Sequence, residues 1–179
     1  QGDLDRLAPA INEALDGGVT INEIKEVFSQ LYAYTGFPRS LNALGTLSKV
    51  LDARKAEGKK DDEGKAWKRP KVWDDAKLAL KKGTETQTKL SGKPFNYDFC
   101  PQDDYYLKAH LFGDIFAGDQ LSASDREIVT VAALASIKGI APQLAAHQKG
   151  AVNMGNTQEQ VDELMRFLSD KGLSQCDNA

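Results

Sequence analysis

Apolar residues recur at intervals of three and four along most of this chain, which is the spacing that gathers side chains on one face of an α-helix. The first such stretch runs from Leu4 to Leu15 and stops at Gly17-Gly18. The second opens with Thr20-Ile-Asn-Glu23, a capping box in which each end residue bonds the backbone N–H of the other. No convincing alternating pattern of a β-strand is present, so the sequence predicts an all-α fold.

The stretch 128–137 is apolar on nearly every side, which indicates a helix buried among its neighbours. Its alanines and the preceding Ser124-Asp-Arg-Glu127, a second capping pattern, favour helix over strand. Gly139 is expected to end this helix and Pro142 to start the next one. A sharp corner is expected at Gly36, with Pro38 in the first turn of the following helix.

Residues 6–28 and 143–165 align without gaps at an offset of 137, and six of the 23 positions are identical. The shared pattern is a helix, a glycine stop, a threonine cap and a second helix, although any two capped helix pairs share part of it. A helix pair of this kind buries little alone, so the two copies predict related modules that need neighbours. The first copy lacks a preceding buried helix, which a removed upstream segment or another subunit would supply.

The segment 52–93 has a different composition from the rest of the chain. It holds 13 of the 23 Lys and Arg residues and eight acids, a local net charge of +5 against −8 elsewhere. We interpret it as a solvated connector with a short helix near 73–82, while contact with phosphate or an acidic partner is the alternative. The expected parts are a partial first module at 1–55, a basic connector at 56–103 and a second module at 104–172.

The 179 residues carry a net charge of −3, so the charge of the whole chain gives no indication of nucleic-acid binding. No apolar run approaches the roughly 20 residues that a membrane span needs. The chain starts at Gln1 with no visible signal peptide, so a cytoplasmic location is favoured, with a periplasmic or secreted one if a leader was removed. Cys100 and Cys176 lack the spacing of a zinc site, and whether they pair stays open.

Several motifs together resemble the carboxymuconolactone decarboxylase family, which includes the alkylhydroperoxidase D-like proteins. They are Tyr32–Ala43 around the glycine corner, His110–Phe116, Arg126-Glu127, and Gln143–His147 with Gly155 and Thr157. The resemblance covers about 1–51 and 104–170. It implies an alkylhydroperoxidase D-like all-helical fold with two related modules, the first incomplete. It also implies homo-oligomers, with trimers or hexamers expected and dimers possible.

The sequence departs from the alkylhydroperoxidase members at one informative place. Those members carry Cys-x-x-Cys followed by three residues and a histidine, and the matching cysteine positions before His147 are Ile140 and Gln143. Disulfide redox chemistry needs a thiolate and a resolving thiol within reach of each other. The resemblance therefore favours the decarboxylase-like branch, which needs no cofactor, over thiol peroxidase activity.

His147 and Glu127 are the predicted catalytic residues. His147 lies on the inner face of its helix and matches the family histidine, and an imidazole transfers protons near neutral pH. A satisfied core histidine is the alternative. Glu127 faces inward beside an apolar helix, where a carboxylate suits acid–base work, and it is also the return arm of the predicted capping box.

Arg39, His110 and Tyr34 are the predicted substrate-binding residues. The planar guanidinium of Arg39 suits a carboxylate, although it can equally cap a helix or bridge to a neighbour. His110 belongs to a family-like motif and lies one turn before Asp114, so a surface ion pair is its alternative. Tyr34 is either a core aromatic or a pocket hydroxyl. His110, His147 and Glu127 together are a workable metal ligand set, but they come from three segments and no metal is expected.

The leading hypothesis is a carboxy-lyase similar to 4-carboxymuconolactone decarboxylase, acting on a small carboxylated lactone or related acid by proton transfer. Arg39 would hold a carboxylate, His147 would transfer the proton, and Glu127 would orient or share it. The alternatives are an alkylhydroperoxidase-like antioxidant protein and a non-catalytic oligomeric binding module of the same fold.

Overall fold

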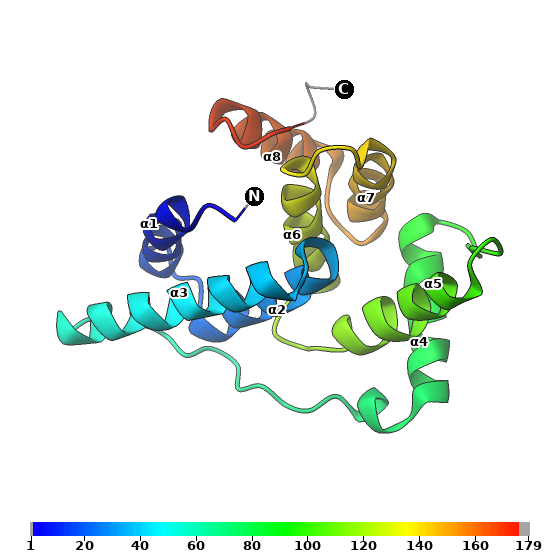
Figure 1. Ribbon diagram of the computed structural model, residues 1–179, viewed down its shortest axis with the longest axis horizontal. Helices are drawn as coiled ribbons and strands as arrows, with labels where there is room; N and C mark the ends of the chain where they lie inside the picture. Colours follow the sequence, from blue (N-terminus) through cyan, green and yellow to red (C-terminus); the bar gives the residue numbers. More distant parts are fainter. Residues whose placement is uncertain (1, 176–179) are drawn as a thin grey trace. The chain divides into compact units, whose positions relative to one another are not determined.

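The computed structural model describes residues 2–175 and contains only helices in that range, which confirms the expected all-α fold (Figure 1). There are eight α-helices, α1 to α8, one short 3-10 helix, η1, and one π-helix, η2, among these residues. The chain divides into two compact units, residues 1–67 and residues 68–179. No helix in the described range is long and apolar enough to cross a membrane.

The first unit packs three helices around one apolar cluster. They are α1 (Leu4–Asp16), α2 (Ile21–Thr35) and α3 (Phe37–Ala56). The predicted capping box of α2 is present, since Thr20 Oγ1 accepts from the Glu23 N–H and Glu23 Oε2 accepts from the Thr20 N–H at 2.8 Å. The core side chains come from all three helices: Ile11, Leu15, Ile21, Ile24, Phe28, Leu47 and Val50.

The corner between α2 and α3 forms at Gly36, as the sequence predicts. Its φ of +83° lies in the region that favours glycine, and its N–H closes α2 by bonding the carbonyl of Tyr32 at 2.9 Å. Pro38 stands in the first turn of α3, where a missing N–H costs nothing. This corner lets α3 fold back along α2 without a linker.

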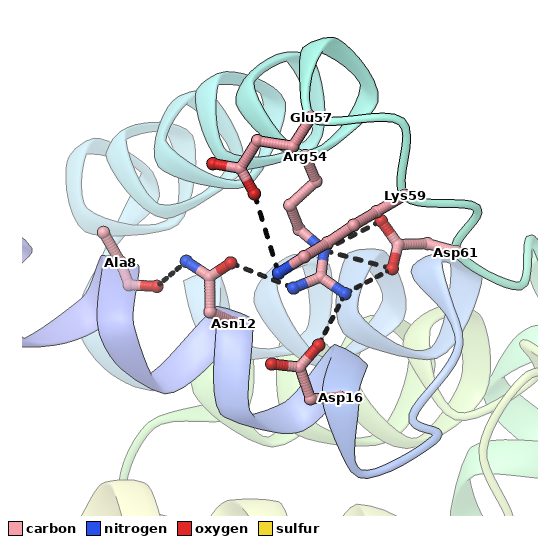
Figure 2. Close-up of polar contacts among 7 residues, drawn as sticks. All are labelled: Ala8, Asn12, Asp16, Arg54, Glu57, Lys59 and Asp61. Atoms are coloured by element: carbon pink, nitrogen blue, oxygen red, sulfur yellow. Dashed lines mark hydrogen bonds and ion pairs between the residues drawn. The ribbon is translucent and has the colours of Figure 1, made fainter.

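Arg54 ties the end of α3 to α1 and to the residues that follow α3 (Figure 2). Its side chain is buried and donates to both carboxylate oxygens of Asp61, to Asp16 at 2.8 Å and to Asn12 at 3.1 Å. Asn12 in turn donates to the carbonyl of Ala8. Hydrogen bonds from Arg54 hold the pKa of Asp61 and of Asp16 below the usual range of a carboxyl group.

Residues 61–65 continue the first unit beyond the boundary that the sequence suggested at 55. The N–H groups of Ile21 and Asn22, at the start of α2, donate to the carbonyls of Asp62 and Glu63. The side chain of Asn22 also donates to the carbonyl of Lys65 at 3.1 Å. These bonds satisfy helix N-terminal donors that have no partner within the helix, so the segment packs on α2.

The second unit contains seven helical elements. They are η1 (Lys71–Asp74), α4 (Ala76–Ser91), α5 (Pro101–Tyr105), η2 (Tyr106–Ile115), α6 (Ala123–Ala135), α7 (Ala141–Asn153) and α8 (Gln158–Asp170). The helix expected near 73–82 is therefore longer than predicted and starts later. Asp75 caps it by accepting from the N–H groups of Lys77 and Leu78. Its length was missed because it buries small and polar residues rather than an apolar stripe.

α4 and η2 approach each other closely through two glycines. A Cβ on Gly83 of α4 would overlap the carbonyl oxygen of Lys108, and a Cβ on Gly113 of η2 would overlap the carbonyl oxygen of Ala79. Backbone contact of this kind is open only to glycine. The segment interpreted as a solvated connector thus contributes a packed helix to the second unit.

α6 lies against both α7 and α8 and buries Val131, Leu134 and Ala135. Its cap differs from the prediction, which placed it at Ser124. Ser122 is the N-cap residue, and its Oγ accepts from the Asp125 N–H at 3.1 Å while donating to the Asp125 carboxylate at 2.6 Å. The predicted capping box of Ser124 and Glu127 is therefore wrong, because Ser122 caps the helix two residues earlier. This leaves Glu127 outside the cap.

The two stretches related by the offset of 137 have matching secondary structure. α1 and α7 begin and end at equivalent positions. Thr157 caps α8 with Gln160 in a capping box, as Thr20 caps α2 with Glu23. The origin of this correspondence in a duplicated module stays a prediction.

Candidate functional site

Glu127 and His147 are brought together between α6 and α7, in the second unit. His147 Nδ1 lies 2.8 Å from Glu127 Oε2. The Glu127 side chain is fully buried and the His147 side chain is 13% exposed. The pair therefore combines a carboxylate group shielded from water with an imidazole that keeps limited access to it. A short contact in a water-poor setting strengthens the electrostatic coupling between the two groups.

The contact engages the Nδ1 nitrogen of His147 with a carboxyl group. A carboxylate at Nδ1 favours the tautomer that carries the proton there and donates it to Glu127. Proton exchange with another molecule then falls to Nε2. This is the arrangement in which a carboxyl group orients a histidine and stabilises its charged form during proton transfer.

The second carboxylate oxygen of Glu127 adds a distinctive feature. Oε1 is buried and has no hydrogen-bond partner in the described structure. Buried polar atoms are nearly always paired, because losing water without a replacement costs free energy. Glu127 Oε1 is therefore an unused acceptor beside a histidine.

The residue before Glu127 has a structural setting. Arg126 is buried, donates to the carbonyl of Gly118 at 2.8 Å and lies over the ring of Phe116 at 5.5 Å. Its carbonyl accepts from the hydroxyl of Thr130. Arg126 thus anchors the start of α6 to the preceding loop, which holds Glu127 at a fixed position along the helix.

His110 lies on η2 and pairs with Asp114 of the same helix. Its Nδ1 is 2.9 Å from Asp114 Oδ2, and the two side chains are 48% and 30% exposed. The carbonyl of Asp114 accepts from the indole of Trp73. The surface pair that was the alternative role for His110 is therefore present, and its role in substrate binding stays a prediction.

Arg39 and Tyr34 belong to the first unit. Arg39 is exposed and donates to the carbonyl of Thr35 at 3.2 Å, which caps the last turn of α2. Tyr34 is partly buried on α2. The capping role allowed for Arg39 is present, while carboxylate binding by Arg39 and Tyr34 stays a prediction.

Three residues around the pair were missed by sequence reasoning. Leu90 of α4 packs against Gly150 of α7, and Asn153 of α7 donates to the carbonyl of Leu90 at 2.7 Å. Leu90 lies in the segment interpreted as a connector, so no apolar pattern pointed to it. Gly150, three residues after His147, was the available signal, since a glycine within a helix often marks a close approach.

The described residues contain no group of three or more His, Cys, Asp or Glu side chains placed to hold a metal ion. Positions 140 and 143, where alkylhydroperoxidase members carry cysteines, hold the N-cap residue of α7 and an exposed glutamine. Cys100 precedes α5, where its Sγ lies 3.6 Å from Gln102 Oε1. Cys176 lies outside the described residues.

Comparison with known proteins shows what part of this unit is similar to. Residues 104–170 match the model of the carboxymuconolactone decarboxylase family. The matched range contains η2, α6, α7 and α8, and therefore both members of the Glu127–His147 pair. This part of the chain is similar to that family, and its helical architecture agrees with the alkylhydroperoxidase D-like fold. Residues 1–51 lie outside the matched range.

A stretch of 59 residues is 41% identical to Peroxisomal protein 2 of Saccharomyces cerevisiae. The match covers 32% of this chain and 20% of that protein, so the two share a short region only. The name of the yeast protein gives no reaction. No solved structure matches the chain.

Proposed function

We propose that the chain is a cofactor-free enzyme that transfers a proton on a small carboxylated molecule, with His147 as the proton-transferring group. The observation that carries this proposal is the contact between His147 and the fully buried Glu127. The match of this domain to the carboxymuconolactone decarboxylase family supports it. A carboxylated lactone or a related acid is the substrate class that fits.

The reaction needs one proton and no redox step. When the bond between the substrate carbon and its carboxylate breaks, carbon dioxide leaves and the electron pair stays on the substrate, where a conjugated carbonyl spreads it. The imidazolium of His147 then donates a proton from Nε2 to carbon. Glu127 stabilises that imidazolium through Nδ1, and Oε1 of Glu127 offers an acceptor to a hydroxyl or N–H of the ligand.

The test is release of carbon dioxide from a panel of small carboxylated lactones and ring acids by the full chain. His147→Gln is expected to lower the turnover rate by about 10²- to 10⁴-fold, the usual contribution of a positioned acid or base. Lys149→Ala, an exposed change on the same helix, is the matched control. Equal rates for His147→Gln and the control would overturn the catalytic role.

The remaining candidates have their own readouts. If Arg39, His110 or Tyr34 binds the substrate carboxylate, its alanine variant raises KM more than it lowers kcat. Assembly into trimers, hexamers or dimers is measured by light scattering. A non-catalytic binding module would bind the acids without turnover. Hydroperoxide turnover that is lost on changing Cys100 or Cys176 would favour the antioxidant alternative.

A further inference from the structure

Helix α4 lies outside the range that matches the family, yet it reaches the Glu127–His147 pair. Its buried residues Ala79, Gly83, Gln87 and Leu90 are spaced by four, four and three, so they share one face. The glycine end of this face packs on η2, and the helix also packs on α7 (Figure 1). The last buried residue of the face is Leu90.

Leu90 occupies the space that the missing side chain of Gly150 leaves open. A Cβ on Gly150 would lie 2.8 Å from Leu90 Cγ and Cδ2 and 3.4 Å from Glu127 Oε2. Leu90 is 5% exposed. The isobutyl group of Leu90 and the carboxylate of Glu127 therefore both border the space at Gly150, three residues after His147 on α7.

A second contact holds Leu90 in place. The amide of Asn153, at the end of α7, donates to the carbonyl of Leu90 at 2.7 Å. Gly92 then ends α4 in the left-handed conformation, with φ of +73°. The C-terminal turn of α4 is thus tied to α7 through backbone as well as through side-chain packing.

We infer that Leu90 is a positioning residue that excludes water from the Glu127–His147 pair by packing into the space at Gly150. This inference rests on the proposed function. Excluding water strengthens the interaction between the two groups and limits the approach to the imidazole. Leu90 lies on α4, which is outside the family-matched region. Helix α4 is therefore the element through which this chain restricts access to the pair.

The chain contains two histidines, which makes a direct test simple. Diethyl pyrocarbonate acylates accessible neutral imidazole, and peptide mass spectrometry follows His147 and His110 separately. The half-exposed His110 is the internal reference for reagent strength. The ratio of the two rates reports access to His147 and requires no substrate.

Leu90→Ala is expected to raise the rate ratio by about threefold to tenfold, because the carboxylate and the imidazole become hydrated. Gly150→Ala is expected to raise it as well, since the new methyl group displaces Leu90. The double variant returns the ratio toward the wild-type value, because the methyl group introduced at position 150 refills part of the space left by Leu90. Additive effects of the two substitutions on the rate ratio would indicate a general loosening of the packing. They would contradict a specific contact between Leu90 and the space at Gly150.

If the Leu90→Ala variant had the wild-type ratio of His147 to His110 acylation rates, the inference would be overturned. Asn153→Ala is the second variant, in case Leu90→Ala folds poorly, and it is expected to raise the ratio by cutting the backbone tie. Because the acylation assay uses no substrate, its failure leaves the carbon dioxide assay of His147→Gln as a separate test of the proposed function.

Discussion

Arg54 in the first unit and Glu127 in the second are both buried ionisable residues, but their hydrogen-bonding environments are opposite. Every guanidinium nitrogen of Arg54 has an acceptor, supplied by Asp61, Asp16 and Asn12 (Figure 2). Glu127 has a partner at one oxygen and none at the other. A complete network holds a unit together, whereas an incomplete one keeps bonding capacity for a ligand. The contrast is the one expected if the first cluster is structural and the second is the site of the proposed function.

Removing the guanidinium from the complete network is the strongest test of that distinction. Arg54→Ala leaves the buried carboxylate of Asp61 without its counter-ion, which is the costly way to break a buried pair. The melting temperature is expected to fall by roughly 10 °C, as measured by calorimetry or circular dichroism. Arg54→Lys keeps the positive charge but loses the several N–H donors of the guanidinium. Its melting temperature is expected to lie between those of the wild type and Arg54→Ala. An unchanged value for Arg54→Ala would show that the cluster contributes no stability.

Two glycine substitutions, one in each unit, are expected to change the free energy of unfolding in opposite directions. Gly83→Ala forces a methyl group onto the backbone of η2 and is expected to lower the free energy of unfolding by about 3 kcal/mol. Gly45→Ala, within α3, meets no atom within 4 Å and is expected to raise it by about 0.5–1 kcal/mol. Urea titration measures both. If the two substitutions had the same sign, the close approach of α4 and η2 would be wrong.

Acid is expected to weaken the first unit through the same network. Arg54 lowers the pKa of Asp61 and Asp16 in the folded state. Their stabilisation is therefore complete above the ordinary carboxyl pKa of about 4, and it is lost as the pH falls through the lowered values. Thermal unfolding between pH 6 and pH 2 measures the loss. Asp61→Asn should flatten the dependence, and parallel curves would contradict the role of this carboxylate.

The incomplete network is expected to contribute little stability. Glu127→Gln keeps an acceptor for His147 Nδ1 and removes a charge from a buried position. The free energy of unfolding is expected to change by less than about 1 kcal/mol, measured by urea titration. A loss as large as that of Arg54→Ala would mean that Glu127 is structural in the same sense, and the contrast between the two units would fail.

The local signals in the sequence predicted local structure well. The capping boxes at Thr20 and Thr157 and the corner at Gly36 depend on residues within four positions of each other, so their chemistry can be read from the chain itself. The cap of α6 was misplaced because two serines stand near its start; Ser122 is the N-cap residue and bonds Asp125, whereas Ser124 lies in the first turn.

Features that depend on contacts distant in sequence were not predictable in this way. The spacing of apolar residues in 106–115 suits an α-helix and a π-helix alike, and packing against α4 accompanies the latter. The inward positions of Glu127 and His147 on their own helices, with the family resemblance, pointed to these two residues, and their catalytic role stays a prediction. The sequence did not predict the position of Leu90, because Leu90 packs where Gly150, 60 positions further along, has no side chain.

The most direct test of a carboxylate site at the Glu127–His147 pair is the shift in melting temperature that small carboxylated lactones and ring acids produce in the wild-type chain and in His147→Gln. A ligand that binds the folded state raises the melting temperature by mass action. We predict a shift in the wild type and in Lys149→Ala that is lost in His147→Gln. Equal shifts in all three, or none from any acid in the wild type, would contradict such a site.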